Sequence, residues 1–326
     1  MSEEPAGLHV PARTIPVPKT ISPEAQAFLS HVPPVQGGEL PDADDIEGWR
    51  AHVAQSDAGM IGMLKVMMAA YPVSSITHQP DKAPIYEVTP ENLDPANDAR
   101  AIFYIHGGGF NMGGGEAAIY AAAQLATATR CRTFSLDYRM PPDHPFPAAL
   151  DDGVAAWRWL IERYKPENIG VYGPSAGGNL VPAVVLKLRE LGLPLPACCA
   201  LHSPASDMTE SGDSYETNAT IDIVLKHKMP QLMQLYAGGH DLRDPLISPV
   251  FADYSGGFPP TMLTTGTRDL LLSSTVLLHR AMRRGGVRAE LHVWEAMTHA
   301  PFFGAPEERE FYEETAGFML AHMGQD

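Results

Sequence analysis

The sequence predicts an α/β fold in which a mostly parallel sheet of eight strands is covered by helices on both faces. From residue 76 onward, short apolar runs alternate with helical patterns, as they do where crossover helices join parallel strands. A chain of 326 residues is long enough for one large domain of this kind or two smaller ones. Its hydrophobic fraction of 44% is that of an ordinary globular protein.

The first part of the chain, residues 1–71, is rich in proline and alanine and shows no strand pattern. Within it, Ile46–Ala70 predicts one or two helices with an apolar stripe that contains several methionines: Met60, Met63, Met67 and Met68. Such a stripe usually packs into the core, and the alternative is a flexible wall over a ligand pocket. We expect residues 1–71 to form N-terminal cap helices.

The strands and helices that follow are predicted in strict order. The strands are Ile76–His78, Ile85–Thr89, Ala101–His106, Arg132–Tyr138, Ile169–Tyr172, Ala197–Ser203, Thr261–Thr265 and Ala289–Glu295. The helices between them are Ala117–Ala128, Ala148–Tyr164, Asn179–Leu191 and Ser273–Arg284. Only a short loop around Gln79–Asp81 separates the first two strands, so we expect these two to form an antiparallel hairpin.

The alternation breaks between Ser203 and Thr261. A polar stretch at Asp207–Thr220 precedes a helical pattern around Ile221–Tyr236 and a turn-rich segment. Because α/β sheets bind ligands beyond the carboxyl ends of their strands, an insertion here would cover such a site. We therefore divide the chain into a catalytic domain, residues 72–206 and 241–326, and a cap insertion, residues 207–240.

Composition excludes several classes of function. A formal net charge of -16 argues against binding to nucleic acid or to an anionic membrane surface, which require a basic face. No apolar run is long enough for stable membrane insertion, and Met1–Pro5 does not begin a signal peptide. The adjacent Cys198 and Cys199 are poorly placed to pair with each other, and no Cys/His spacing predicts a metal site. We expect a reduced, cytoplasmic protein without a metal.

The most informative motif is Gly173-Pro174-Ser175-Ala176-Gly177, which joins an apolar strand to a helical pattern. A serine at such a sharp turn predicts a nucleophile elbow, in which glycines are required at both flanks. The three glycines that follow His106 also end a strand, and only bare backbone allows a close approach to a substrate atom. We expect the N–H groups of Gly107, Gly108 and Ala176 to form an oxyanion hole.

A serine nucleophile needs a base, and the base needs an acid. His299 lies in the loop after the last predicted strand, and Asp269 lies in the polar turn after the strand before it. An N-cap of the next helix is the structural alternative for Asp269, and Glu295 is a rival acid. The order Ser175, Asp269, His299 is the one typical of this elbow. We expect His106 to organise its loop and His202 to be a buried core residue.

Taken together, these motifs resemble the hormone-sensitive-lipase-like (bacterial type IV) family of α/β-hydrolase carboxylesterases, from about Tyr86 to the C-terminus. Further matching segments are Asp137–Arg139, His144–Ala149, Ser203-Pro204 and Asp244–Pro249. The resemblance implies an α/β-hydrolase fold with a helical cap, a Ser175–His299–Asp269 triad and hydrolysis of short- to medium-chain acyl esters without a cofactor. It also implies a possible homodimer.

Departures from the family pattern concern the surroundings of the triad. Pro174 precedes the nucleophile, and Pro301 follows the base, where it could redirect the loop. Phe110 and Asn111 follow the glycine loop and are expected to bind substrate. Phe302 and Phe303 either reach the same pocket or pack beneath the last helix. Arg139 and Asp207 are expected in structural ion pairs.

Two other functions remain compatible with the residues. A lactonase or an amidase would use the same triad. A ligand receptor on the same fold is the non-enzymatic alternative, although such receptors typically lack the catalytic histidine, for which this chain has His299.

Overall fold

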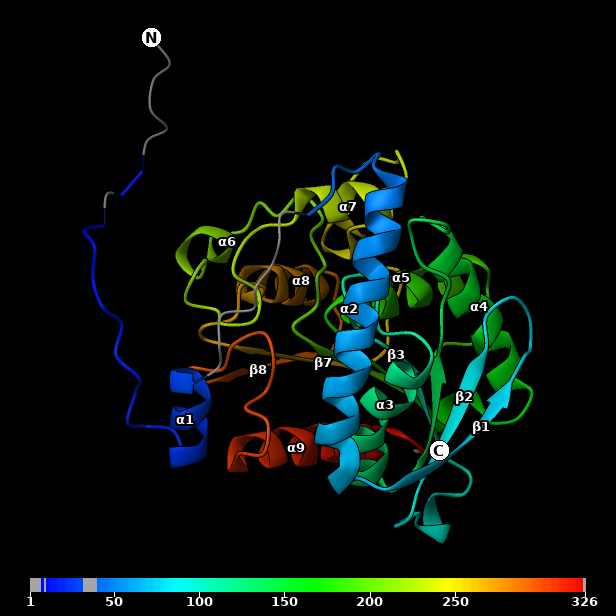
Figure 1. Ribbon diagram of the computed structural model, residues 1–326. Coiled ribbons are helices and arrows are strands. Elements are labelled where there is room, and N and C mark those ends of the chain that lie inside the picture. The colour runs from blue at the N-terminus through cyan, green and yellow to red at the C-terminus, as the bar shows by residue number, and fades with distance from the viewer. Residues whose placement is uncertain (1–6, 9, 32–39, 325–326) are drawn as a thin grey trace.

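The computed structural model describes residues 7–8, 10–31 and 40–324, and within them the predicted sheet is present (Figure 1). Its strands are β1 (Val73–His78), β2 (Ile85–Pro90), β3 (Ala101–Ile105), β4 (Arg132–Leu136), β5 (Ile169–Pro174), β6 (Cys198–His202), β7 (Thr261–Gly266) and β8 (Ala289–Trp294). They form one sheet in the order β1-β2-β4-β3-β5-β6-β7-β8. The antiparallel β1–β2 hairpin is confirmed, and β2 also pairs with β4 in antiparallel fashion.

The parallel part of the sheet brings distant segments to one edge. β3 pairs with β5, β5 with β6, β6 with β7 and β7 with β8, all in parallel. The strands β3, β5, β6 and β7 are almost entirely buried, as expected where both faces of a sheet are covered. Consequently the loops that carry the glycine run, Ser175, Asp269 and His299 all leave the sheet at its carboxyl edge.

Helices cover the two faces of the sheet. The helices are α1 (Pro23–His31), α2 (Ile46–Met67), α3 (Glu116–Thr129), α4 (Ala148–Ile161), α5 (Ala176–Glu190), α6 (Ser214–Thr217), α7 (Pro230–Ala237), α8 (Leu272–Arg284) and α9 (Pro306–His322). Short 3₁₀ turns lie at Met68–Ala70, Pro95–Asn97, Pro166–Asn168 and Pro249–Phe251. Apolar residues of α3 and α9 pack in one core cluster, and those of α4, α5 and α8 pack in another. The predicted sheet of eight mostly parallel strands, covered by helices, is confirmed.

The insertion after β6 is less helical than the sequence suggests. The helix expected around Ile221–Tyr236 is wrong for its first half, since α7 begins only at Pro230. Residues 221–229 form turns instead, because the Asp222 side chain accepts hydrogen bonds from the N–H groups of Val224 (2.8 Å) and Leu225 (3.1 Å). In Figure 1 α7 lies at the top of the molecule and α6 at its upper left.

The long helix α2 runs the height of the molecule in Figure 1 and packs on α3. Its methionines do not form one buried stripe. Met68, just after α2, is buried, whereas Met63 is largely exposed. The Met60 sulfur lies 3.5 Å from the position that a Cβ on Gly113 would take, so Met60 covers the loop that follows the glycine run.

The N-terminal helix α1, which the sequence analysis does not predict, packs against the C-terminal region. Ser22 donates from its N–H and its hydroxyl to the two carboxylate oxygens of Glu307, at 2.6 and 2.7 Å. Phe28 stacks edge-on against Phe302, with ring centroids 5.7 Å apart. Helix α1 is thus fastened to the loop that leaves β8 and to the start of α9.

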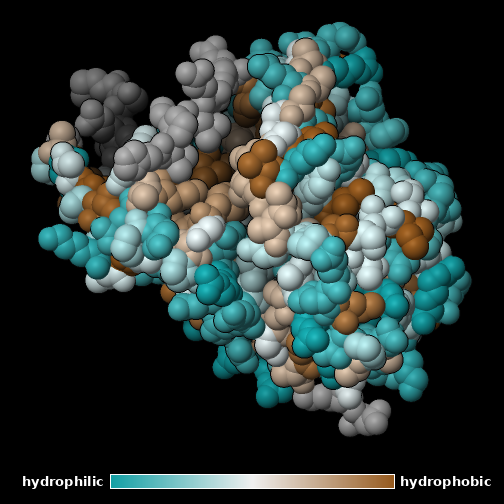
Figure 2. Space-filling view, turned by 60° about the horizontal axis from the view of Figure 1, so that its bottom comes forward, coloured by the Kyte–Doolittle hydropathy of each residue, from teal (hydrophilic) through white to brown (hydrophobic). Residues whose placement is uncertain are grey.

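The surface and the cysteines complete the description. The face in Figure 2 is mostly hydrophilic, with apolar side chains in separate patches. Within the described ranges, no helix has the length and apolar character needed to cross a bilayer. Cys131, Cys198 and Cys199 are buried and form no disulfide.

Candidate active site

Ser175 lies at the turn between β5 and α5. Its backbone has φ 55° and ψ -117°, a conformation that L-residues rarely adopt and that raises the side chain clear of the sheet. The turn is held in place because the Ser175 N–H donates to the His202 carbonyl at 2.8 Å, and the Ser175 carbonyl accepts from the N–H of Ala205 at 3.1 Å. The strained turn is therefore fixed from β6.

The flanking glycines are required by contact, as predicted. A Cβ on Gly173 would overlap the Gly177 carbonyl, and a Cβ on Gly177 would overlap the carbonyl oxygen of Ile105 at the end of β3. The second contact also shows how closely α5 approaches β3. Close packing of this kind places the glycine loop after β3 next to the nucleophile.

The glycine loop supplies unpaired backbone donors. Gly107 lies against the nucleophile, because a Cβ there would be 3.4 Å from the Ser175 Cβ. Gly108 has φ +113°, and a Cβ on it would overlap the Met112 carbonyl. Within the described residues, the N–H groups of Gly107, Gly108 and Ala176 donate to no protein acceptor. These are the three groups that the sequence assigns to the oxyanion hole.

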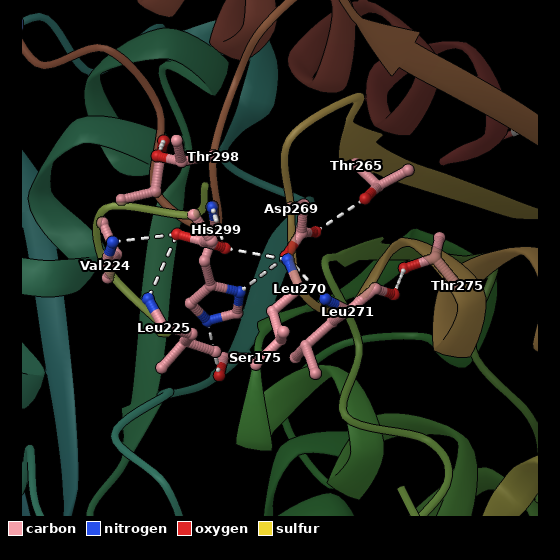
Figure 3. A network of polar contacts seen from close by, with 12 residues as sticks. Ser175, Val224, Leu225, Thr265, Asp269, Leu270, Leu271, Thr275, Thr298 and His299 are labelled. Carbon is pink, nitrogen blue, oxygen red and sulfur yellow. Dashed lines mark hydrogen bonds and ion pairs between the residues drawn. The ribbon is translucent and has the colours of Figure 1, made fainter. Parts of the chain in front are cut away.

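His299 contacts both other members of the expected triad. Its Nε2 lies 2.9 Å from Ser175 Oγ, and its Nδ1 lies 3.3 Å from Asp269 Oδ1 (Figure 3). With its proton on Nδ1, the ring donates to Asp269 and accepts from the serine hydroxyl. Burial acts to lower the pKa of His299, but the hydrogen bond that its ring donates to Asp269, with the charges of Asp269 and Asp222, raises it overall.

Asp269 is fully buried at the end of β7. Its Oδ2 accepts from the Thr265 hydroxyl at 2.6 Å, and its Oδ1 accepts from the Leu271 N–H at 2.9 Å as well as from His299. Burial acts to raise the pKa of this carboxyl, but His299 and Thr265 lower it overall. Asp269 therefore both faces His299 and holds the turn before α8. It is not the N-cap of α8, which is Leu271, so the capping alternative is wrong.

The sequence analysis misses Asp222, a second buried carboxylate beside the base. Its Oδ2 accepts from the backbone N–H of Leu270 at 2.8 Å and of His299 at 3.1 Å, while its Oδ1 binds the N–H groups of its own turn. Figure 3 shows the residues that it joins, Val224, Leu225, Leu270 and His299, gathered in one place. Burial, with Asp269 adding to it, raises the pKa of Asp222. No sequence signal identifies this residue, because it lies in a turn far from any strand end.

The other titratable candidates do not take the role of base or acid. His202 is buried as expected, with Nδ1 3.0 Å from Thr264 Oγ1 and Nε2 donating to the His299 carbonyl at 3.2 Å; burial lowers its pKa to about 4. His106 organises its loop, as expected: its ring stacks on Tyr138, and its Nδ1 lies 2.7 Å from the Gly107 carbonyl oxygen. Glu295 is exposed and makes no contact with His299 within the described residues.

Phe110 and Asn111, the two residues expected to bind substrate, line different cavities in the structure. Phe110 is buried, stacks on Tyr236 with ring centroids 4.0 Å apart and lines the cavity beside Ser175. Asn111 does not line that cavity and faces a groove of about 460 Å³ between α2 and residues 137–143. The side chains of adjacent residues diverge here because Phe110 has φ 67°.

Contacts in the structure test the expectations for Arg139, Asp207, Phe302 and Phe303. Arg139 forms the expected ion pair, with Asp152 at 2.8 Å. Asp207 forms no ion pair with any residue that the structure describes; its oxygens accept instead from the hydroxyls of Thr209 and Ser211. Phe302 is buried against α1, and neither it nor Phe303 lines the cavity beside Ser175. The described residues contain no group of three His, Cys, Asp or Glu side chains arranged to hold a metal ion.

Comparison with known proteins identifies relatives of one kind. Residues 102–303 match the family model described as alpha/beta hydrolase fold. An acetyl-hydrolase from Streptomyces hygroscopicus is 32% identical over 251 residues, covering 75% of this chain and 84% of the relative. A carboxylesterase from Mycobacterium tuberculosis is 28% identical over 269 residues, covering 79% and 82%.

Solved structures agree with these relatives. The crystal structure of an esterase called E25 superposes with a TM-score of 0.90 at 36% identity, covering 97% of this chain and 99% of that one. An esterase described as from the bacterial hormone-sensitive lipase family superposes with a TM-score of 0.77 at 31% identity, covering 93% and 99%.

Proposed function

Since the chain belongs to the hormone-sensitive-lipase-like family of α/β-hydrolase esterases, we propose that it hydrolyses short- to medium-chain acyl esters through Ser175, His299 and Asp269. That it is an esterase of the serine hydrolase class follows from the family. The observation that carries the finer proposal is the continuous hydrogen-bonded run from Ser175 Oγ through both ring nitrogens of His299 to the buried Asp269.

In the first step Ser175 Oγ attacks the ester carbonyl carbon while His299 Nε2 takes the hydroxyl proton. The carbonyl oxygen becomes an oxyanion, for which the N–H groups of Gly107, Gly108 and Ala176 are free donors. Asp269 stabilises the imidazolium that forms and keeps the ring in the required tautomer. The alcohol then leaves with the proton from His299, and the acyl group remains on Ser175.

In the second step a water molecule attacks the acyl carbon as His299 Nε2 takes one of its protons. Collapse of the second oxyanion breaks the bond to Oγ, and His299 returns the proton to Ser175. The carboxylic acid is released, and the free enzyme is restored.

The cap contributes to this site through residues 207–240. Leu225, Met229 and Met233 line the cavity beside Ser175, together with Phe110 and Leu270. The N-terminal helix α2 instead lines the groove that Asn111 faces. We assign residues 72–206 and 241–326 to the catalytic domain and the remaining segments, 1–71 and 207–240, to its cap.

Replacement of Ser175 by alanine tests the proposal. We expect Ser175→Ala to lower kcat/KM for p-nitrophenyl acetate by roughly 10⁴-fold or more in folded protein, because the nucleophile is lost. Folding is checked by circular dichroism. Hydrolysis near the wild-type rate would overturn the assignment.

Labelling with a fluorophosphonate distinguishes an esterase from a ligand receptor on the same fold. An activated Ser175 should be labelled in the wild type and not in Ser175→Ala, as shown by peptide mass spectrometry. Folded wild-type protein that stays unlabelled would favour the receptor. A panel of esters, lactones and anilides of equal acyl length then separates esterase from lactonase and amidase activity.

A further inference from the structure

The cavity beside Ser175 is small and mostly enclosed by side chains. It measures about 50 Å³ and is walled by Ala176, Phe110 and the cap residues Met229 and Met233. Because one water needs roughly 10–15 Å³ on this measure, the cavity holds about three to five non-hydrogen atoms. Only a short chain fits there.

One wall of this cavity is a buried acid, Glu210. Its side chain belongs to a residue that is only 6% exposed and that has φ 48°, a left-handed backbone unusual for a glutamate. Glu210 Oε1 accepts from the Met229 N–H at 2.8 Å, and no described residue donates to Oε2. Burial and the charge of Asp207 raise the pKa of Glu210. The hydrogen bond from the Met229 N–H and the charge of Lys228 act to lower it, but they do not outweigh this rise.

Glu210 differs in this respect from its neighbour in the same cavity. Asp207 has both oxygens occupied, since Oδ1 accepts from the N–H and hydroxyl of Thr209, and Oδ2 accepts from the Ser211 hydroxyl. Glu210 Oε2 is not one of the fully enclosed unpaired polar atoms of the described residues, so it keeps accessible surface at which a ligand donor can bind. Among the described residues that line this cavity, Glu210 is therefore the carboxyl group with an oxygen still available to accept a hydrogen bond from a ligand.

We propose that the cavity binds a short acyl group carrying a hydroxyl, which donates to Glu210 Oε2. This rests on the proposed esterase function. The acyl group stays bonded to Ser175 while the alcohol must leave to solvent, so the mostly enclosed cavity suits the acyl part of the ester. A neutral hydroxyl suits it better than an ammonium group. An ammonium has three N–H groups to pair, whereas Asp207 already has both oxygens occupied and Phe110, Met229 and Met233 are apolar, so its desolvation would cost more.

The test uses pairs of esters with the same alcohol and isosteric acyl groups that differ in one hydroxyl. The pairs are 3-hydroxybutyryl against 3-methylbutyryl and 3-hydroxypropionyl against butyryl. For each pair, the ratio of kcat/KM for the hydroxylated ester to that for the alkyl ester is measured in the wild type and in Glu210→Met. We expect the ratio to fall by roughly 10–100-fold in the variant, because a hydrogen bond to a carboxylate is lost. Intrinsic reactivity cancels in this comparison.

A second variant keeps the test decisive if Glu210→Met folds poorly. In Glu210→Gln the amide oxygen can keep the Met229 N–H, which turns the amide nitrogen toward the cavity. The NH₂ group can then donate only a neutral hydrogen bond to the hydroxyl oxygen, which is weaker than the bond to a carboxylate, so the ratio should fall, but by less than in Glu210→Met. Glu216→Gln is the matched control: it removes the same charge from the same insertion, but at an exposed side chain paired with Lys228, and it should leave the ratio unchanged.

The outcomes separate this inference from the proposed function. An unchanged ratio in folded Glu210→Met or Glu210→Gln overturns the hydroxyacyl proposal alone, provided that the wild type hydrolyses esters and Ser175→Ala does not. A wild type that hydrolyses none of the esters, including p-nitrophenyl acetate, overturns the triad proposal and this inference together.

Discussion

His299 lies between two buried carboxylates that come from different parts of the chain. Asp269, from the end of β7, receives the ring N–H, while Asp222, from the cap insertion, receives the backbone N–H of the same residue. His202 holds the His299 carbonyl from a third side. The ring and the backbone of the proposed base are thus fixed separately.

The first residue-scale expectation concerns pH. The raised pKa of His299 means that the ring stays protonated, and unable to act as a base, at pH values where an ordinary histidine is already neutral. We therefore expect kcat/KM to rise with pH through a midpoint above about 6.5. A pH profile with a neutral ester measures it. A midpoint well below 6 would contradict the assigned surroundings of the base.

Asp222→Asn tests the second carboxylate as a positioning residue. The charge of Asp222 helps to raise the pKa of His299, so the midpoint of the pH profile should move to lower pH. In the wild type both carboxylate oxygens accept from backbone N–H groups. In the variant the asparagine NH₂ faces one of these N–H groups, so that hydrogen bond is lost, and kcat/KM above the midpoint should also fall, by roughly 10–100-fold. A merely structural role would not move the midpoint.

The control for Asp222→Asn is Asp213→Asn, an exposed change in the same insertion whose side chain does not cap α6. It should leave both the midpoint and the rate unchanged. An Asp222→Asn enzyme with the wild-type midpoint would contradict the positioning role.

Sequence reasoning reaches some of these residues and not others, for physical reasons. Ser175, Asp269 and His299 can be predicted because each follows a recognisable strand, and parallel strands end at one edge. Asp222 cannot be predicted this way, since its role depends on how a turn in the insertion folds back onto two loops. The side chains of Phe110 and Asn111 point to different cavities because Phe110 has a positive φ. The residue types alone do not predict this φ value.

At the scale of elements, the contact between α5 and β3 decides whether the elbow can form. Gly177 at the start of α5 lies so close to Ile105 that a methyl group has no room. Gly177→Ala should therefore push α5 from the sheet, lower the free energy of unfolding by about 3 kcal/mol and reduce activity. Urea denaturation and ester hydrolysis measure the two effects.

Gly62→Ala is the matched control for that substitution. Gly62 lies within α2, and nothing lies within 4 Å of the Cβ that it would gain. Alanine in a helix interior should raise the free energy of unfolding by about 0.5–1 kcal/mol. Equal losses in the two variants would contradict the crowding at the elbow.

The elements themselves are largely predictable, because buried parallel strands form short apolar runs separated by amphipathic helices. The failures are in the cap. The apolar residues of 221–229 read as part of a helix, but the Asp222 side chain binds the backbone N–H groups of its own turn and competes with helix formation. The position of the short α1 in the fold could not be predicted, because the sequence around it contains no strand pattern with which the helix could be paired.

At the scale of the whole molecule, α1 and the loop after His299 support each other. Phe28 packs against Phe302 and Phe303, and Ile21 and Ala25 join the same apolar cluster as Met297. Phe28→Ala should lower the free energy of unfolding by about 1–2 kcal/mol, less than for a fully buried phenylalanine. It should also speed amide hydrogen exchange in residues 296–305, followed by mass spectrometry.

The control for Phe28→Ala is Leu191→Ala, an exposed apolar residue just after α5 and outside this cluster. It should change neither stability nor exchange in residues 296–305. Exchange that stays slow in Phe28→Ala would show that α1 does not brace the loop.

The bond between Ser22 and Glu307 joins residues 285 positions apart. At the usual pace of translation, about 5–20 residues per second, roughly 15 to 60 seconds pass between the synthesis of one partner and that of the other. During that interval α1 has no place to dock, and neither β8 nor the histidine after it exists. With the proposed triad, a ribosome-bound chain that already carries the serine elbow still lacks His299, and we expect it to be inert toward esters. Hydrolysis would then begin only when the last strand and its loop have been made.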